Sequence, residues 1–213
     1  MAAVGLRKLL YAILKTDTAD ADTTYGDVKI FGKAIESSFN PSLAEAELYA
    51  DDALAESVTE FSKGDLTLGV SDDDDSVFAE VLGKQAKEIT VGQNKLIEVV
   101  STGDDTPPWV GVAQIVPKMV NGIKKYKAEV LVKVKFKPYQ QAAKTKGKTL
   151  EFTTPSVTGI VALAENGVYK RHATCSTEDE ALSYITHVFG STLDKIKELY
   201  STPDTEDGGE AAE

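Results

Sequence analysis

KKYKAEVLVKVKFK, the stretch from Lys124 to Lys137, follows an Asn121-Gly122 pair and alternates in side-chain character almost residue by residue. A period of two is typical of a β-strand that buries one face. The expected apolar face comprises Tyr126, Ala128, Val130, Val132, Val134 and Phe136, with Leu131 out of phase. Such a strand is about 36 Å long from Tyr126 to Phe136, longer than a small domain needs to cover its own core. We therefore expect part of it to contact something outside this chain.

The other face of this strand is basic. Ten lysines between Lys118 and Lys148 are opposed by one acid, Glu129, so this segment carries +9 and the remainder −20 of the total charge of −11. Two interpretations are open: a solvated face, or a basic surface that binds the acidic surface of another copy of the chain. The four lysines assigned to this basic strand are Lys127, Lys133, Lys135 and Lys137. Nucleic acid is a poorer partner, because no aromatic platform accompanies the lysines and the overall charge repels DNA.

The composition suits one domain. A length of 213 residues is enough for an ordinary core, and we expect a single domain over residues 1–200. The only cysteine, Cys175, cannot form an intrachain disulfide. The apolar stretch Leu9–Leu14 is too short for an export signal, and no segment is long enough for a membrane span, so we expect a soluble, unsecreted chain. The small, acidic residues 201–213 predict disorder.

Alternation and turn residues predict a mainly β chain with helices near its carboxyl end. Strands are expected over residues 9–14, 28–39 with an irregularity at Gly32, 58–70, 95–100, 109–116 and 149–163 with a bulge or edge near Pro155. The segment from Asn40 to Ser57 is too long for a hairpin turn and predicts a functional or docking loop.

Three helices are expected. Acidic residues and a capping serine, Ser76, precede a short helix over 77–82, which Gly83 ends. Thr177 and Glu180 form a capping box before a helix that runs to Phe189. After Gly190 a second short helix is expected to include Leu193, Ile196 and Leu199.

No motif points to catalysis. Gly147-Lys148-Thr149 imitates the end of a phosphate-binding loop, but Ala142 stands where that motif needs glycine. The Asp72–Asp75 run lacks the glycine and the final glutamate of a calcium loop, where this chain has Val77 and Gly83. His172, His187 and Cys175 match no metal or nucleophile spacing. We therefore expect no catalytic residue, metal site or cofactor.

Several segments resemble the major tail tube proteins of long-tailed bacteriophages with non-contractile tails, particularly those of Gram-positive hosts. The segments are Val4–Ala12, Ala46–Asp52 with Ala55-Glu56, Gly64–Leu68, Tyr126-Lys127 with the strand that follows, Lys144–Gly147, Phe152–Pro155 and Gly159. They extend over roughly residues 4 to 162, and the Leu48–Asp52 run, LYADD, is the most specific. No motif of the family is recognised after Gly167.

The resemblance implies a mainly β fold with flanking helix, a β-sandwich or partial barrel whose subunits share a closed inner β-barrel in a hexameric ring. Rings would stack into a tube around a tape-measure protein, with terminator or initiator proteins at its ends, and genomic DNA would pass through the lumen without specific binding. The chain would be a structural protein and not an enzyme, located in the virion tail after assembly in the host cytoplasm. Leu48, Tyr49, Ala50, Asp51 and Asp52 would be central to an inter-ring or inter-subunit arm.

Two other functions share the same pattern of strands. A tube subunit of a contractile injection machine has the same fold by analogy, and only the motif resemblance separates it. A β-sandwich binding module, secreted or soluble, would also show such strands, although a secreted one would be expected to carry an export signal.

Overall fold

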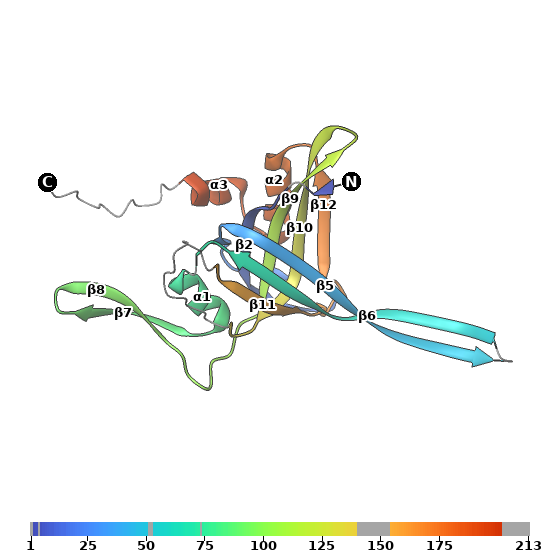
Figure 1. The fold of residues 1–213 in the computed structure, drawn as a ribbon, viewed down its shortest axis with the longest axis horizontal. Helices are drawn as coiled ribbons and strands as arrows, with labels where there is room; N and C mark the ends of the chain where they lie inside the picture. Colours follow the sequence, from blue (N-terminus) through green and yellow to red (C-terminus); the bar gives the residue numbers. More distant parts are fainter. Residues whose placement is uncertain (1, 4, 51–52, 73, 140–153, 202–213) are drawn as a thin grey trace, which may run out of the picture.

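The computed structural model describes every residue except 1, 4, 51–52, 73, 140–153 and 202–213, and the described part is mainly β (Figure 1). Ten strands form one antiparallel sheet in the order β3-β2-β9-β10-β11-β6-β5, with β4 also on β2, β1 also on β9 and β12 also on β10. Their bounds are β1 (Ala2–Ala3), β2 (Arg7–Thr16), β3 (Thr24–Tyr25), β4 (Lys29–Gly32), β5 (Ala34–Ala50), β6 (Ala53–Val70), β9 (Val110–Val120), β10 (Ile123–Phe136), β11 (Ser156–Val161) and β12 (Lys170–Cys175). A separate two-stranded ribbon joins β7 (Gln85–Val91) to β8 (Asn94–Val100).

The predicted long strand is confirmed as β10, at the centre of the sheet. Its turn with β9 is formed by Asn121 and Gly122, whose φ angles of 52° and 77° are both positive, as a type I′ hairpin requires. The single apolar face expected for this strand is wrong. Leu131 pairs with Val112 but Val134 pairs with Val110, so one extra residue forms a β-bulge between them.

This bulge moves the apolar residues of β10 from one face of the sheet to the other. Ala128, Val130 and Val132 belong to one core, whereas Leu131, Val134 and Phe136 belong to the other. Leu131 is therefore a core residue of the opposite face and not an irregularity.

Each face of the sheet has its own hydrophobic core. One core lies under α1 (Asp75–Leu82), which contributes Phe78, Val81 and Leu82. The other lies under α2 (Glu178–Phe189) and α3 (Leu193–Ser201). Strand β2 serves both cores, because Leu9 and Tyr11 face the first and Leu10 and Ala12 face the second.

The sheet curls around the first core. Phe31 of β4 and Val70 of β6 share this core although their strands stand near opposite ends of the sheet, and the backbone N–H of Ser71 donates to the carbonyl of Lys33. The ladder does not continue between these ends, so the described residues of one chain form no closed barrel. The mainly β fold expected from the sequence is thus a single, curved antiparallel sheet with α1 on one face and α2 and α3 on the other.

The predicted loop from Asn40 to Ser57 is wrong, because the described residues of this segment lie in a long β-hairpin. Strands β5 and β6 pair from Ala34–Val70 out to Ala50–Ala53. Their outer halves are rich in alanine and glutamate, which have low strand propensity, and Pro41 lies within β5. The local composition therefore disfavours strands in this segment. The strands form because β5 and β6 pair with each other over many residues.

The helices and their ends confirm most of the capping predictions. Asp74, rather than Ser76, is the amino-terminal cap of α1, and its side chain accepts from the backbone N–H groups of Ser76 and Val77. Thr177 accepts from the N–H of Glu180 at the start of α2. Gly83 and Gly190 end α1 and α2 in the left-handed conformation.

Candidate assembly interface

The outer half of the β5–β6 hairpin projects from the body as an arm, here defined as residues 41–61 (Figure 1). Strand β6 leaves its neighbour β11 after the pair Gly64–Val161, so beyond this point no other strand of the described residues pairs with either edge of the ribbon. Its large apolar side chains face solvent, since Leu48 is 58% and Tyr49 64% exposed. An isolated two-stranded ribbon is marginally stable in water, and free edges readily pair with another chain. The arm therefore has the form of a segment that a partner completes.

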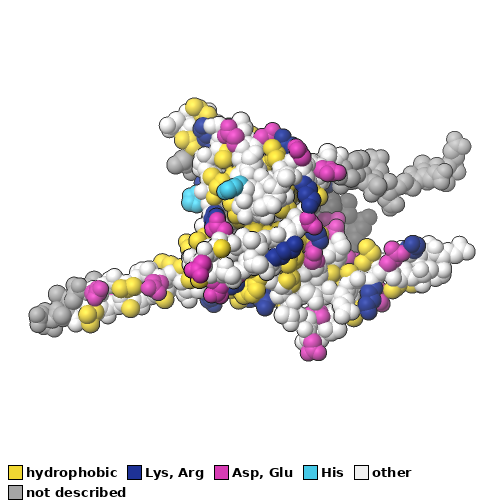
Figure 2. All heavy atoms as spheres, turned by 180° about the vertical axis from the view of Figure 1, so that it is seen from behind, with side chains coloured by type: hydrophobic (Ala, Val, Ile, Leu, Met, Phe, Trp, Pro, Cys, Tyr) yellow, Lys and Arg dark blue, Asp and Glu magenta, His cyan; other side chains and the backbone are white. Residues whose placement is uncertain are grey.

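The two faces of the arm differ in chemistry. Directly paired residues share a face, so Glu45 and Glu47 lie with Thr59 and Ser57 on a face that is polar at its middle and has the Leu43–Phe61 pair at its base. The opposite face has an apolar strip flanked by two carboxylates; its residues are Ala44, Ala46, Leu48, Glu56, Val58 and Glu60. Figure 2 shows hydrophobic and acidic side chains side by side along the arm. We name the second face the apolar arm face.

The arm is strongly acidic. Residues 41–61 hold six Asp or Glu and no Lys or Arg. Of the predicted arm residues, Leu48 and Tyr49 are exposed near its end, and the Tyr49 hydroxyl donates to Glu47 at 2.9 Å. Ala50 ends β5, whereas Asp51 and Asp52 lie outside the described residues.

Lys127 of the predicted basic strand is paired within the chain. Its side chain is 18% exposed and forms an ion pair with Glu129, which also receives Lys170 at 3.2 Å and the Gln114 amide at 3.1 Å. Burial alone raises the pKa of Glu129, but the hydrogen bonds from Lys127 and Gln114 and the charge of Lys170 outweigh it and lower the pKa to about 2. This cluster joins β9, β10 and β12.

Lys133 is also committed within the chain. Its side chain is 14% exposed, and its Nζ lies 2.6 Å from Asp17 Oδ2 and 5.2 Å from the ring centre of Trp109. Lys135 lies over the same ring at 5.4 Å, and Lys137 is exposed at the end of β10. Strand β10 carries Lys127, Lys133 and Lys135, and Lys137 follows its last residue. The single basic face expected from the sequence is wrong, because the bulge after Leu131 puts Lys127 and Lys135 on opposite faces of the sheet. Two of the four lysines, Lys127 and Lys133, are also unavailable to a partner.

The β7–β8 ribbon is a second projecting hairpin, which the sequence analysis found only in part. Strand β8 matches the predicted strand over 95–100, whereas β7 was missed. Val91, Leu96 and Ile97 are about half exposed or more. The available signal was the alternation of Ile89 and Val91 before Gly92, whose φ is 67°.

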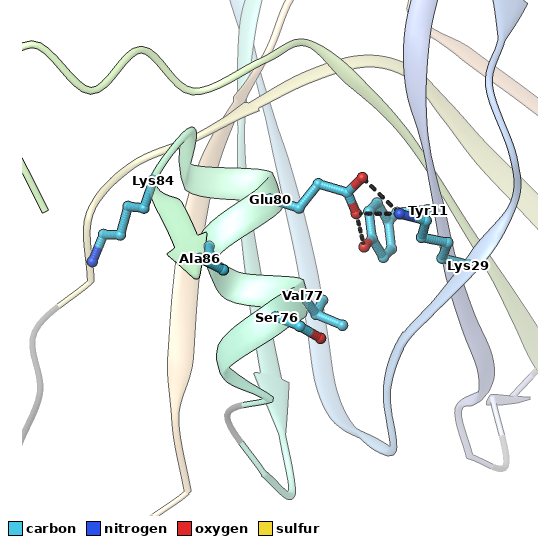
Figure 3. A pocket seen from close by; sticks show the side chains of 8 residues that line it. Tyr11, Lys29, Ser76, Val77, Glu80, Lys84 and Ala86 are labelled. Atoms are coloured by element: carbon cyan, nitrogen blue, oxygen red, sulfur yellow. Dashed lines mark hydrogen bonds and ion pairs between the residues drawn. The ribbon is translucent and has the colours of Figure 1, made fainter. Parts of the chain in front are cut away.

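A hollow of about 330 Å³ beside α1 contains a polar cluster (Figure 3). Glu80 points from α1 toward the sheet, where it accepts the Tyr11 hydroxyl at 2.5 Å and Lys29 Nζ at 2.7 Å. Burial and the contact with Glu80 raise the pKa of Tyr11 well above its ordinary value. The Tyr11 hydroxyl therefore stays protonated and serves as a donor that ties α1 to β2.

The residues tested for chemistry are dispersed. His172 and Cys175 lie on β12 and His187 on α2, and burial raises the pKa of the Cys175 thiol. Among the described residues no three His, Cys, Asp or Glu side chains converge closely enough to hold a metal ion. Asp74 of the acidic run caps α1, and the Gly147-Lys148-Thr149 triplet lies outside the described residues.

The part of the chain that the structure describes has no helix with the length and apolarity of a bilayer span. A hollow of about 930 Å³ lies between the start of β2, the β4–β5 connection and α3, and is lined by charges of both signs. Neither a model of a known protein family nor any curated protein sequence matches this chain.

Proposed function

We propose that this chain is a structural subunit of a bacteriophage tail tube, which assembles into hexameric rings that stack around a tape-measure protein. The observation that carries the proposal is the arm, which has two free edges, two solvent-exposed faces and exposed leucine and tyrosine side chains. A folded chain that retains such a ribbon needs a partner to bury it. The motif resemblance described above includes the arm itself.

The curved sheet supports the same proposal. Within one chain it stops short of closure, and β5 has a free edge along its whole length in the described residues. Strand pairing between subunits removes such edges by closing a barrel. A contact in which the arm of one copy binds a different surface of the next copy is heterologous, so it forms rings when it closes and filaments when it does not.

The charge of the chain suits a conduit for DNA. A net charge of −11 and an arm without basic residues repel a polyanion, so DNA would slide along such a surface without binding. We expect the subunit to act by its assembly and shape and to need no catalytic centre.

The test is the behaviour of the purified chain across concentration, followed by light scattering and negative-stain electron microscopy. Sixfold rings and hollow tubes are the expected result. A chain that remains monomeric at every concentration, also after addition of the tape-measure and initiator proteins of the same tail, would overturn the proposal and leave a monomeric binding module as the better interpretation.

A further inference from the structure

The turn of the β9–β10 hairpin carries three lysines, Lys118, Lys124 and Lys125, which we call the basic tip. Lys118 and Lys125 are directly opposite each other in the ladder. Like charges in this position repel and destabilise a hairpin. Among the described residues no carboxylate forms an ion pair with any of the three: Lys125 contacts the Ser176 hydroxyl at 3.0 Å, and Lys124 lies over the Tyr126 ring. The basic tip therefore presents an uncompensated positive charge.

Apolar side chains adjoin this charge. Val120 pairs with Ile123 two residues beyond the Lys118–Lys125 pair, so the two pairs share one face of the hairpin. Ile123 is 62% exposed, although an isoleucine at this position gains nothing from contact with water. A lysine pair next to the exposed side chain of Ile123 and the half-buried Val120 fits a partner that is both acidic and apolar.

The apolar arm face offers that combination. Along β6, Glu56 and Glu60 flank Val58, and Leu48 and Ala46 lie opposite on β5. In the tip a lysine pair lies two residues, about 6.7 Å, from the apolar pair Val120–Ile123. In the arm, single glutamates paired with apolar residues lie two residues to either side of Val58. The two surfaces are thus opposite in charge, and on each of them an apolar side chain lies two residues from a charged one.

One copy cannot bring these two surfaces together, because the arm and the basic tip point away from the body in different directions (Figure 1). We propose that the basic tip of one copy binds the apolar arm face of a second copy, with Lys118 and Lys125 next to Glu56 and Glu60. This inference rests on the proposed self-assembly and names the surfaces that carry it. Each copy keeps one free arm and one free tip after the first contact, so the contact propagates from copy to copy.

This contact replaces the basic strand as the receptor for the acidic surface. Lys127 and Lys133 are held by Glu129 and Asp17 inside the chain, whereas the tip lysines have no such partner in the described residues. The polar arm face with Glu45 and Glu47 stays open in this arrangement, and it is free to face a lumen.

The experiment is a charge-reversal series in the full chain. One variant combines Lys118→Glu with Lys125→Glu, a second combines Glu56→Lys with Glu60→Lys, and a third carries all four changes. The matched control reverses two exposed lysines elsewhere, Lys15→Glu with Lys87→Glu. Sedimentation velocity measures assembly at several salt concentrations, and circular dichroism verifies that each variant is folded.

We expect each double reversal to weaken association at least about tenfold and the fourfold variant to recover it, since opposite charges meet again. The control should assemble like the unchanged chain, and rising salt should weaken association of both the unchanged and the fourfold variant. Carbodiimide treatment of a mixture of ¹⁴N- and ¹⁵N-labelled chains should give cross-links between Lys125 or Lys118 and Glu56 or Glu60 that contain both isotopes.

Failure of the inference and failure of the proposed function give different results. If the unchanged chain assembles and the tip variant assembles equally well, or the fourfold variant shows no recovery, the arm binds another surface and this inference is wrong. If the unchanged chain never assembles, the proposed function and the inference fall together. The tip reversal could also weaken assembly while the arm reversal leaves it unchanged. In that case the tip binds a different acidic surface, and the proposed pairing of tip and arm is wrong.

Discussion

Replacing Glu129 by glutamine should destabilise the fold in a pH-dependent way. The Glu129 carboxylate is 14% exposed and accepts from Lys127, Lys170 and Gln114, which come from three strands. Glutamine keeps the shape of the side chain but removes its charge, and it leaves two half-buried lysines, Lys127 and Lys170, without their counter-ion.

The expected loss follows from the pKa of this group. Its ordinary pKa of 4.5 falls to about 2 in the folded chain, which corresponds to about 3 kcal/mol of folding free energy at 1.36 kcal/mol per pKa unit. A lowered pKa means that the stabilisation is fully present above pH 4.5 and is lost as the pH falls toward 2. By linkage, about 1.4 kcal/mol of it is gone at pH 3.5.

The assay is urea unfolding of the unchanged chain and of Glu129→Gln between pH 7 and pH 3.5. We expect a loss of about 2 to 3 kcal/mol at pH 7 that becomes clearly smaller at pH 3.5. The control is Glu88→Gln, because the Glu88 side chain is 62% exposed in its ion pair with Lys95. This substitution should change the free energy of unfolding by less than about 0.5 kcal/mol. A loss that is the same at both pH values would refute the electrostatic reasoning.

Two further substitutions test the packing of the two faces of the sheet. A Cβ at Gly111 would lie 2.5 Å from a ring carbon of Tyr25 and 2.6 Å from one of Phe189, so Gly111→Ala should lower the free energy of unfolding by about 1 to 3 kcal/mol. Gly103→Ala, with no atom within 4 Å, is its control, and equal stability of the two variants in urea unfolding would contradict this packing. Tyr11→Phe removes the donor to the carboxylate on α1 and should cost about 1.5 to 3 kcal/mol; an unchanged thermal midpoint would show that this tie is unimportant.

The sequence predicted those elements whose signals are local. The strand character of β10, the Asn121-Gly122 turn and the capping residues Thr177 and Gly190 all depend on signals within a few residues, and the structure confirms each of them. The carboxyl-terminal helices were predicted for the same reason.

The features that the sequence did not predict depend on pairing between distant residues. The bulge after Leu131 is a change in the register between β10 and β9. It lets the apolar residues of β10 contribute to two cores on opposite faces of the sheet. The arm has few residues that favour strands, so only the pairing of Ala44 with Glu60 and of its neighbours makes it a hairpin. The ion pairs of Lys127 and Lys133 likewise depend on acids that the fold brings close.

The position of this exposed segment was therefore predicted from the sequence, but its β-hairpin structure was not. The exposed segment around Leu48 and Tyr49 is where the sequence placed a docking arm, and it is an amphipathic ribbon and not a loop. The lysine-rich hairpin was also found from the sequence, but which lysines lack a partner is a property of the folded chain.

Hydrogen exchange over residues 43–61, compared between the monomer and the assembled chain, tests most directly that the arm is completed by another copy. In the monomer this ribbon buries little and should exchange within seconds, whereas the core strand β10 stays protected. In the assembled chain the arm amides should become protected at least about a hundredfold. An arm that is already protected in the monomer, or one that exchanges equally fast after assembly, would contradict the account.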